Sequence, residues 1–179
     1  LMIKDIVKAF HPEVLRLFLL SNHYRSPLDY TEQAMREAGS GLDKIYSLLQ
    51  RLADLFGVWP PESTAEVPAE ALSDGIWQRF CDAMNDDFNT ARAIGLLFDA
   101  VRNLNRRLDT EASETLLSDG RLLTEATDIL RMGDVLGLMA ESPQAYFEKR
   151  KHEVIDTQGI DPAWVEEKIR ERAAARKAK

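Results

Sequence analysis

The sequence predicts an all-α protein built as an antiparallel helix bundle, and three observations carry this prediction. Apolar residues recur at steps of three and four along most of the chain, as they do on one face of an α-helix. The polar and proline-rich stretches between these periodic segments are short, which favours antiparallel neighbours. The 179 residues are 45% hydrophobic and 30% charged, the balance of a globular protein that buries its own core.

The first 30 residues are expected to form a short mixed segment ahead of the bundle. A helix should begin at His11 and Pro12, because proline suits the first helical position. Polar residues follow this helix, and Pro27 among them disfavours helical geometry at Ser26. Residues 21–30 are therefore expected to form a loop or a short strand.

Residues 31–56 carry one continuous apolar stripe and open the bundle. Thr31 suits the N-cap, and Gly57 can end the helix. The stripe consists of Ala34, Met35, Ala38, Leu42, Ile45, Leu48, Leu49, Leu52 and Phe56. Three prolines within residues 57–68 exclude a helix interior, so this stretch is expected to be a linker.

Three further helices are expected to complete the bundle. Thr90 is the expected N-cap of the second of them, and Gly133 is expected to bend the third or end it early. The three helices are predicted over residues 72–85, 91–108 and 113–139. A polar break separates the first two and is expected to cap the second.

The C-terminal part is expected to be a helical segment of its own. Pro143 opens a short piece that runs through His152, and Asp161 with Pro162 suits the start of a last helix. The chain is thereby divided into a segment of residues 1–30, a bundle of residues 31–142 and a C-terminal segment of residues 143–179.

Charge and composition exclude several classes of protein. The net charge of −7 argues against a protein that coats nucleic acid indiscriminately, because such binding depends on the density of cations. The acidic excess lies within residues 31–141, whereas both ends are net positive. Cys81 is the only cysteine, so no internal disulfide can form, and no Cys/His spacing resembles a zinc site. The apolar runs are too short for a membrane span or a signal peptide, which predicts a cytoplasmic protein.

Two stretches of sequence together resemble one family. P-E-V-L-R at residues 12–16, followed by L-L-S-N-H-Y-R-S-P-L-D-Y at residues 19–30, is similar to cysteinyl-tRNA synthetases just after their catalytic signature loop. A-M-N-D-D-F-N-T-A-R-A at residues 83–93 resembles the A-M-D-D-D-F-N-T-P-R-A segment of the same family. Ala91 stands where that family usually has proline, and Asn22 stands where glycine is common.

The resemblance implies a C-terminal piece of a class I synthetase, truncated at both ends. The whole enzyme would activate cysteine with ATP and transfer it to its tRNA. The ATP-binding K-M-S-K-S loop, the H-I-G-H-type motif and the zinc ligands would lie upstream. By this reading residues 31–142 form the DALR type of anticodon-binding bundle. The piece would hold no catalytic, cofactor or metal site and would be inactive alone. Its partners would be the tRNA for cysteine and the upstream catalytic domain, with no DNA or membrane partner.

Two groups of residues are the candidate contacts to tRNA. His23, Tyr24 and Arg25 offer forked donors and aromatic rings to the inner side of the tRNA, although the same residues could brace the bundle. The second group lies on the basic side of the last expected helix and consists of Lys168, Arg172, Arg176 and Lys177. Neighbouring glutamates leave open an ordinary salt-bridged helix for this second group.

Other charged residues favour structural roles. Asp86, Asp87 and Asn89 are expected to cap the helix that follows them rather than to bind metal. Arg16 is expected to form a structural salt bridge. Two other functions remain open for the whole chain. One is a helical protein–protein interaction module without RNA binding, and the other is the same region of a related ligase that joins cysteine to an amino sugar.

Overall fold

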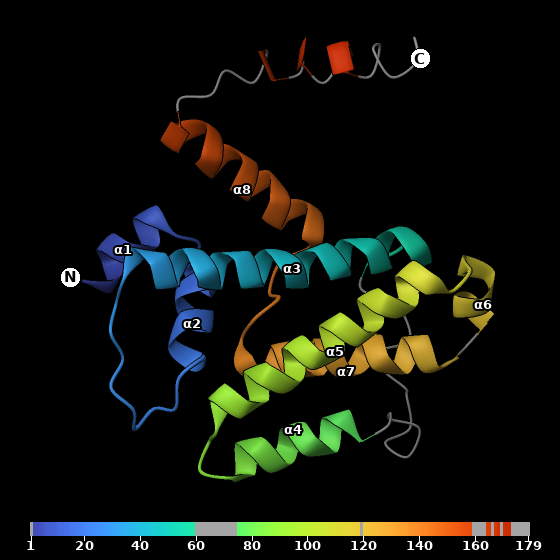
Figure 1. Ribbon diagram of the computed structural model, residues 1–179, viewed down its shortest axis with the longest axis horizontal. Coiled ribbons are helices and arrows are strands. Elements are labelled where there is room, and N and C mark those ends of the chain that lie inside the picture. The colour runs from blue at the N-terminus through green and yellow to red at the C-terminus, as the bar shows by residue number, and fades with distance from the viewer. Residues whose placement is uncertain are drawn as a thin grey trace. The chain divides into compact units, whose positions relative to one another are not determined.

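The computed structural model describes residues 2–59, 75–118, 120–158, 164–165, 167–168 and 170–172. Its elements are all helices, and no described residue lies in a strand (Figure 1). The all-α prediction is confirmed. The helices are α1 (Ile3–Ala9), α2 (Pro12–Leu20), α3 (Glu32–Phe56), α4 (Ile76–Asn85), α5 (Thr90–Thr110), α6 (Ser113–Ser118), α7 (Gly120–Leu136) and α8 (Pro143–Gln158). Most of the expected linker lies outside the described residues.

Helix α3 has the ends that the sequence predicts. The Thr31 hydroxyl accepts a hydrogen bond from the Ala34 N–H at 3.1 Å, and Gly57 ends the helix with a left-handed φ of 72°. Most of the apolar stripe between these ends is buried, with Leu42, Ile45 and Leu49 fully shielded from solvent. Helix α3 packs against α2 and α5, so this stripe forms the centre of the core.

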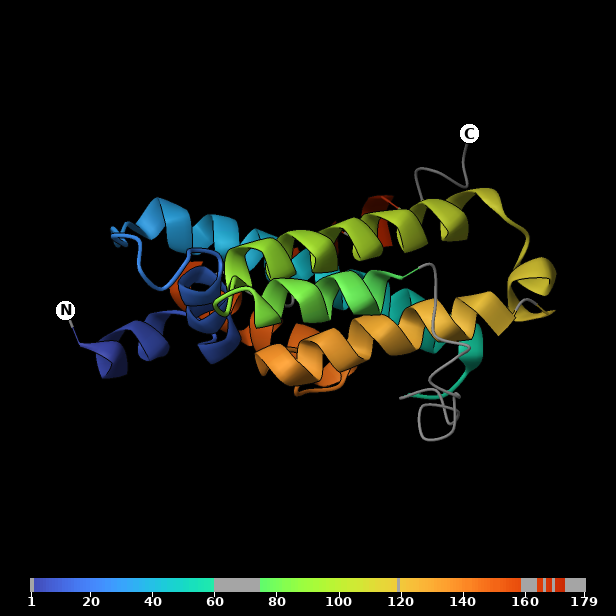
Figure 2. The ribbon, with the colours of Figure 1, turned by 90° about the horizontal axis from the view of Figure 1, so that it is seen from below.

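Helix α5 links the rest of the bundle, because it packs against α3, α4 and α7. The successive long helices α3, α4, α5 and α7 alternate in direction, as an antiparallel bundle requires (Figure 1). Seen from below, α4, α5 and α7 run alongside one another (Figure 2). The turn between α4 and α5 therefore lies at one end of the bundle, and the end of α7 returns to that side.

The predicted start of α5 is wrong by one residue. The Asn89 side chain, not that of Thr90, accepts from the Arg92 N–H at 3.1 Å and caps the helix. The preceding Asp87 and Phe88 both have left-handed φ angles, 54° and 51°. The tight turn explains the shift, because it delivers the Asn89 carboxamide to the first free N–H groups.

The single helix predicted over residues 113–139 is also wrong, because the chain forms α6 and α7 there. Gly133 does not end α7, which continues to Leu136. The stop lies at Gly137, whose φ is 65°, and the Gly137 and Leu138 N–H groups donate to the Asp134 and Gly133 carbonyls at 3.1 and 2.8 Å. This pattern is a Schellman cap, which needs a left-handed residue just after the helix.

The chain divides into two units, residues 1–143 and 144–179. The second unit contains most of α8, which continues six residues beyond the predicted end at His152. Asp161 and Pro162, the expected start of the last helix, lie outside the described residues. Within the described ranges, no helix combines the length and the apolar character needed to cross a bilayer. The further division of the first unit at residue 30 stays a prediction.

Candidate functional site

The three neighbours His23, Tyr24 and Arg25 converge on one carboxylate more than 60 residues away in the sequence. The Tyr24 hydroxyl donates to Asp87 Oδ1 at 2.8 Å, and Arg25 Nη1 lies 3.0 Å from Asp87 Oδ2. His23 Nε2 lies 3.8 Å from the same Oδ2. We call these four residues the Asp87 cluster. The cluster ties the loop after α2 to the turn between α4 and α5.

The rings of the Asp87 cluster are also stacked. The His23 and Tyr24 rings lie 4.9 Å apart at 23° to one another, and the Arg25 guanidinium lies 5.3 Å from the Tyr24 ring centroid. The hydrogen bond to Asp87 raises the pKa of Tyr24, because the carboxylate favours the protonated hydroxyl. The Arg25 side chain remains 69% exposed despite its ion pair. It therefore keeps donors that face solvent.

Of the residues expected to cap α5, Asn89 does so, whereas the Asp87 carboxylate binds the side chains of its cluster instead. Non-glycine residues with left-handed φ are uncommon and cost about 1–3 kcal/mol each, so they persist where other contacts hold them. Asp87 is held by the three side chains of its cluster. Phe88, the next residue, has no such polar contact and is 68% exposed.

A pocket of about 540 Å³ lies beside the Asp87 cluster. Its lining is mainly apolar, and it consists of Leu19, Leu20, Asn22, His23, Tyr24, Ser26, Leu28, Phe88 and Thr90. These residues come from the end of α2, the loop after it and the turn before α5. The pocket therefore lies where two distant parts of the sequence meet.

A second polar junction in the first unit is buried, and its residues were not among the candidates predicted from the sequence. Glu13, on α2, is 4% exposed. Its two oxygens accept from the Tyr46 hydroxyl at 3.1 Å and from the Met139 and Ala140 N–H groups at 2.9 and 3.0 Å. We call this junction the Glu13 anchor. The only signal in the sequence is an acidic residue at the start of an apolar helix.

Arg16 strengthens the same junction, but not by the predicted salt bridge. Its guanidinium donates to the Gly137 carbonyl at the end of α7. The carbonyl is available there because the Schellman cap turns the chain away from the helix. His11 adds a contact to Glu141, with Nε2 and Oε1 separated by 3.5 Å. Helix α2 thus holds the segment that follows α7.

Burial and the Glu13 charge raise the pKa of Tyr46 well above its ordinary value. Both causes act in the same direction, since each disfavours the tyrosinate anion. Tyr46 is therefore a hydrogen-bond donor throughout the physiological pH range. Its fully buried ring also fixes the position of the hydroxyl on α3.

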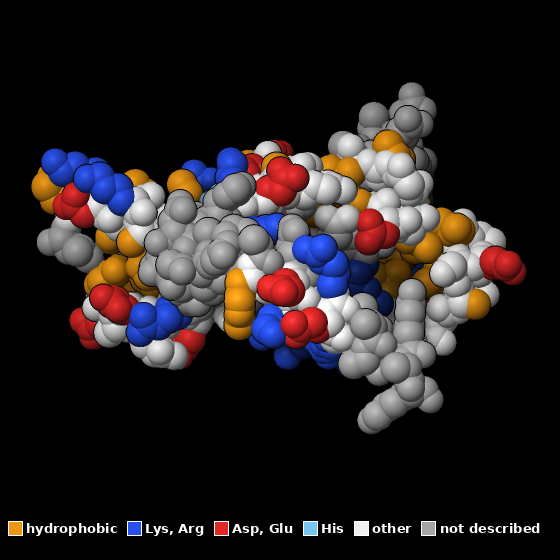
Figure 3. Space-filling view, turned by 90° about the horizontal axis from the view of Figure 1, so that it is seen from above, with side chains coloured by type: hydrophobic (Ala, Val, Ile, Leu, Met, Phe, Trp, Pro, Cys, Tyr) orange, Lys and Arg blue, Asp and Glu red, His pale blue; other side chains and the backbone are white. Residues whose placement is uncertain are grey.

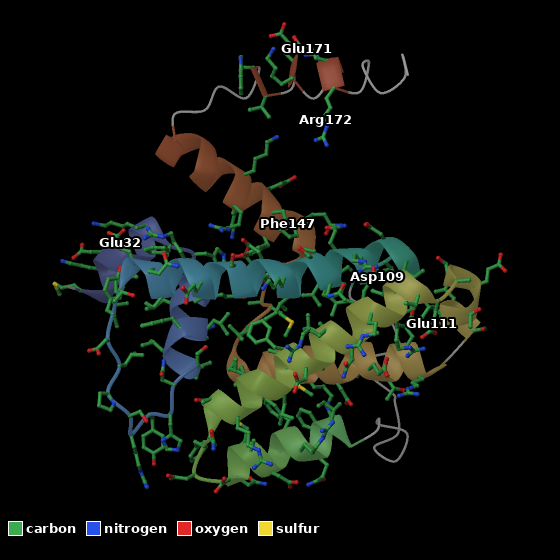
Figure 4. All side chains as sticks on the ribbon, viewed as in Figure 1. Glu32, Asp109, Glu111, Phe147, Glu171 and Arg172 are labelled. Carbon is green, nitrogen blue, oxygen red and sulfur yellow. The ribbon has the colours of Figure 1, made fainter. Side chains whose placement is uncertain are left out.

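The second group of candidate residues lies in the other unit. Lys168 and Arg172 are exposed, and Lys168 Nζ pairs with Glu171 at 2.8 Å. Glu171 and Arg172 project to opposite sides of the chain (Figure 4). Arg176 and Lys177 lie outside the described residues. The contacts of all these residues with tRNA stay a prediction.

Two of the arginines on α5, Arg102 and Arg107, form ion pairs. Arg102 pairs with Asp99, and Asp109 accepts from Arg51 of α3 at 2.7 Å. Arg107 contacts Glu125 of α7 at 2.6 Å. On the face drawn in Figure 3, the coloured Lys and Arg side chains alternate with Asp and Glu. Among the described residues, no group of His, Cys, Asp and Glu is arranged to hold a metal ion.

Comparison with protein families finds two matches in this chain. Residues 1–40 match the model for the class I (C) tRNA synthetase catalytic domain, and residues 79–140 match the DALR domain. The Glu13 anchor and the Asp87 cluster each join a residue of the first match to a residue of the second. The two matched segments are therefore linked by direct polar contacts.

Curated relatives match almost the whole chain. A cysteine–tRNA ligase of Trichlorobacter lovleyi is 40% identical over 99% of this chain, and one of Geobacter sulfurreducens is 41% identical over 99%. A cysteine–tRNA ligase of Methylococcus capsulatus is 36% identical, also over 99% of this chain. The chain spans 37%, 36% and 34% of the lengths of these three relatives.

Proposed function

We propose that this chain, which corresponds to the C-terminal portion of a cysteine–tRNA ligase and contains its DALR domain, holds the tRNA for the enzyme. The observation that carries this proposal is the match to cysteine–tRNA ligases over 99% of the chain, across both family segments. In the whole enzyme, ATP and zinc would be bound by a catalytic domain, which would charge the tRNA with cysteine.

The two polar junctions support a positioning role. The Glu13 anchor and the Asp87 cluster tie the end of the catalytic-domain segment to the helices of the DALR domain. Two junctions at different points fix both the distance and the angle between the parts that they join. A tRNA held by the helices would then present its acceptor end at a fixed place, and correct placement of reactants lowers the barrier to reaction.

The proposed tRNA contacts are the two groups predicted from the sequence. In the first group, Arg25 keeps exposed donors beside the exposed ring of Tyr24, with His23 stacked behind that ring. The second group is Lys168, Arg172, Arg176 and Lys177. Arg and Lys side chains bind phosphate oxygens, and a few such contacts suffice for a chain with net negative charge.

A titration of the 179-residue chain with tRNA tests this function. Binding to the tRNA for cysteine should weaken as salt rises, and it should exceed binding to a tRNA for another amino acid at each salt concentration. The variant Arg172→Ala should weaken binding and lower the salt slope by about one unit. Arg36→Ala is the matched control, because Arg36 is an exposed helical arginine outside both groups.

The alternatives predict different results in the same titration. A protein–protein interaction module would bind neither tRNA, even at low salt. The corresponding region of a ligase that acts on an amino sugar would show no preference for the tRNA for cysteine. Equal affinity for both tRNAs, or no binding at low salt, would overturn the proposal.

A further inference from the structure

The pocket beside the Asp87 cluster has the lining that a flat aromatic ligand needs. Leu19 and Leu28 remain 45% and 37% exposed there, although they are large apolar residues. Tyr24 and Phe88 are 61% and 68% exposed as residues, and both belong to the same lining. Apolar surface that is open to water and concave is the usual character of a ligand site.

The Phe88 side chain faces solvent and is not packed in the core. It follows Asp87 in a second left-handed conformation, which a phenylalanine rarely adopts. The cost is not offset by burial of its ring, because most of the ring surface is open to solvent. The contacts of Asp87 and the Asn89 cap hold the turn on either side. A strained turn that displays an aromatic ring indicates a binding function for the ring.

We propose that this pocket binds one unstacked nucleobase of the tRNA, stacked against the ring of Phe88. The proposal rests on the tRNA-holding function and adds the part of the RNA that is recognised. Bases that leave the stack are bound in proteins by aromatic side chains and by Arg guanidinium planes. The pocket volume of about 540 Å³ can hold a base together with its ribose.

The polar groups around the pocket favour RNA over an apolar protein segment. Arg25 lies over the Tyr24 ring and can reach a phosphate that flanks the bound base. Asn22 and Ser26 place an amide and a hydroxyl in the lining, and these groups can hydrogen-bond a base edge. An apolar protein segment in the same place would leave them without partners.

Substitutions at Phe88 separate stacking from general apolar contact. Phe88→Leu keeps an apolar side chain but removes the ring, whereas Phe88→Tyr keeps the ring. We expect Phe88→Leu and Phe88→Ala to weaken binding of the 179-residue chain to the tRNA for cysteine about tenfold or more. Phe88→Tyr should stay within about threefold, and the salt slope should not change in any variant, since no phosphate contact is lost. Leu117→Ala, which removes another exposed apolar side chain, is the control.

A second measurement tests the base directly. A short single-stranded RNA should shift the amide NMR signals of Asn22, Ser26 and Phe88, whereas a duplex of the same sequence should not. Absence of these shifts would overturn the proposal, and so would equal shifts with the duplex.

The outcomes distinguish this proposal from the function on which it rests. If the unaltered chain binds no tRNA at low salt, the function itself fails. If the chain binds the tRNA for cysteine and all Phe88 variants bind equally well, only the nucleobase site fails. If Phe88→Leu binds normally while Phe88→Ala does not, the surface makes an apolar contact of the kind that a protein partner uses, and the nucleobase site is again overturned.

Discussion

The variant Glu13→Gln should destabilise the first unit strongly, although it changes only one oxygen to an amide nitrogen. The Glu13 carboxylate accepts from three donors through both of its oxygens. A carboxamide accepts through one oxygen only, so its NH₂ group faces either the Met139 or the Ala140 N–H. A donor thus meets a donor in a site that is 4% exposed at Glu13.

The size of the effect follows from the number of hydrogen bonds involved. A hydrogen bond to a charged acceptor contributes about 1.5–3 kcal/mol, and a buried donor without an acceptor costs about 1–3 kcal/mol. In Glu13→Gln one such hydrogen bond is lost, and the N–H group that loses its acceptor can partly turn to water. We therefore expect the free energy of unfolding to fall by about 2–3 kcal/mol. Glu13→Ala also leaves the hydroxyl of the fully buried Tyr46 without its acceptor. We therefore expect the free energy of unfolding to fall by about 3–5 kcal/mol.

Urea denaturation, followed by circular dichroism, measures these differences in the free energy of unfolding. Glu37→Gln is the matched control, because Glu37 is exposed on α3 and accepts only from Gln33, the residue one turn earlier. The control should stay within about 0.5 kcal/mol of the unaltered chain. A Glu13→Gln variant as stable as this control would refute the anchor as a source of stability.

Three further predictions concern the same unit and the whole chain. Because the pKa of Tyr46 is raised, the folded state keeps a proton that the unfolded state loses above the ordinary tyrosine value of 10.0, so stability should fall as pH rises beyond it. Denaturation curves at several alkaline pH values should show a shallower fall in Tyr46→Phe, and an identical fall would contradict the assignment. Gly137→Ala should cost about 1–2 kcal/mol from the left-handed backbone alone, and more because the new Cβ would lie 3.0 Å from Arg16 Nη1. Thermal unfolding measures this loss, and an unchanged midpoint would disprove it. The isolated chain should form no aminoacyl-adenylate, so any pyrophosphate exchange that depends on ATP and cysteine would refute that expectation.

Local signals in the sequence were sufficient for α3 and insufficient for α7. The cap at Thr31 and the stop at Gly57 act within a few residues, so both ends of α3 could be predicted. Gly133 and Gly137 are equally visible in the sequence, but only Gly137 adopts the left-handed geometry. The difference depends on the contacts of the chain beyond the helix, where Arg16 holds the Gly137 carbonyl. The end of a helix that depends on a residue distant in the sequence cannot be predicted from the residues around it.

In the candidate site, too, contacts between residues distant in the sequence could not be predicted from local patterns. His23, Tyr24 and Arg25 could be singled out because their side chains carry recognisable chemistry. Their common partner Asp87 was assigned to helix capping, since nothing in a linear pattern joins residues more than 60 positions apart. The Glu13 anchor could not be predicted from the sequence for a further reason. Two of its donors are main-chain N–H groups, which every residue except proline possesses.

That use of the main chain determines which substitutions the junction tolerates. Glu13 binds Met139 and Ala140 through their N–H groups, so the identity of those two side chains is irrelevant to these hydrogen bonds. Position 140 can accept other residues, proline excepted, while the joint keeps its geometry. Met139 has a left-handed φ of 63°, so β-branched and bulky residues are disfavoured at that position. Glu13 and Tyr46 have no such freedom, because each supplies a side-chain group that the other needs. A designer who wished to alter the surface of this segment could therefore vary residue 140 and leave the connection intact.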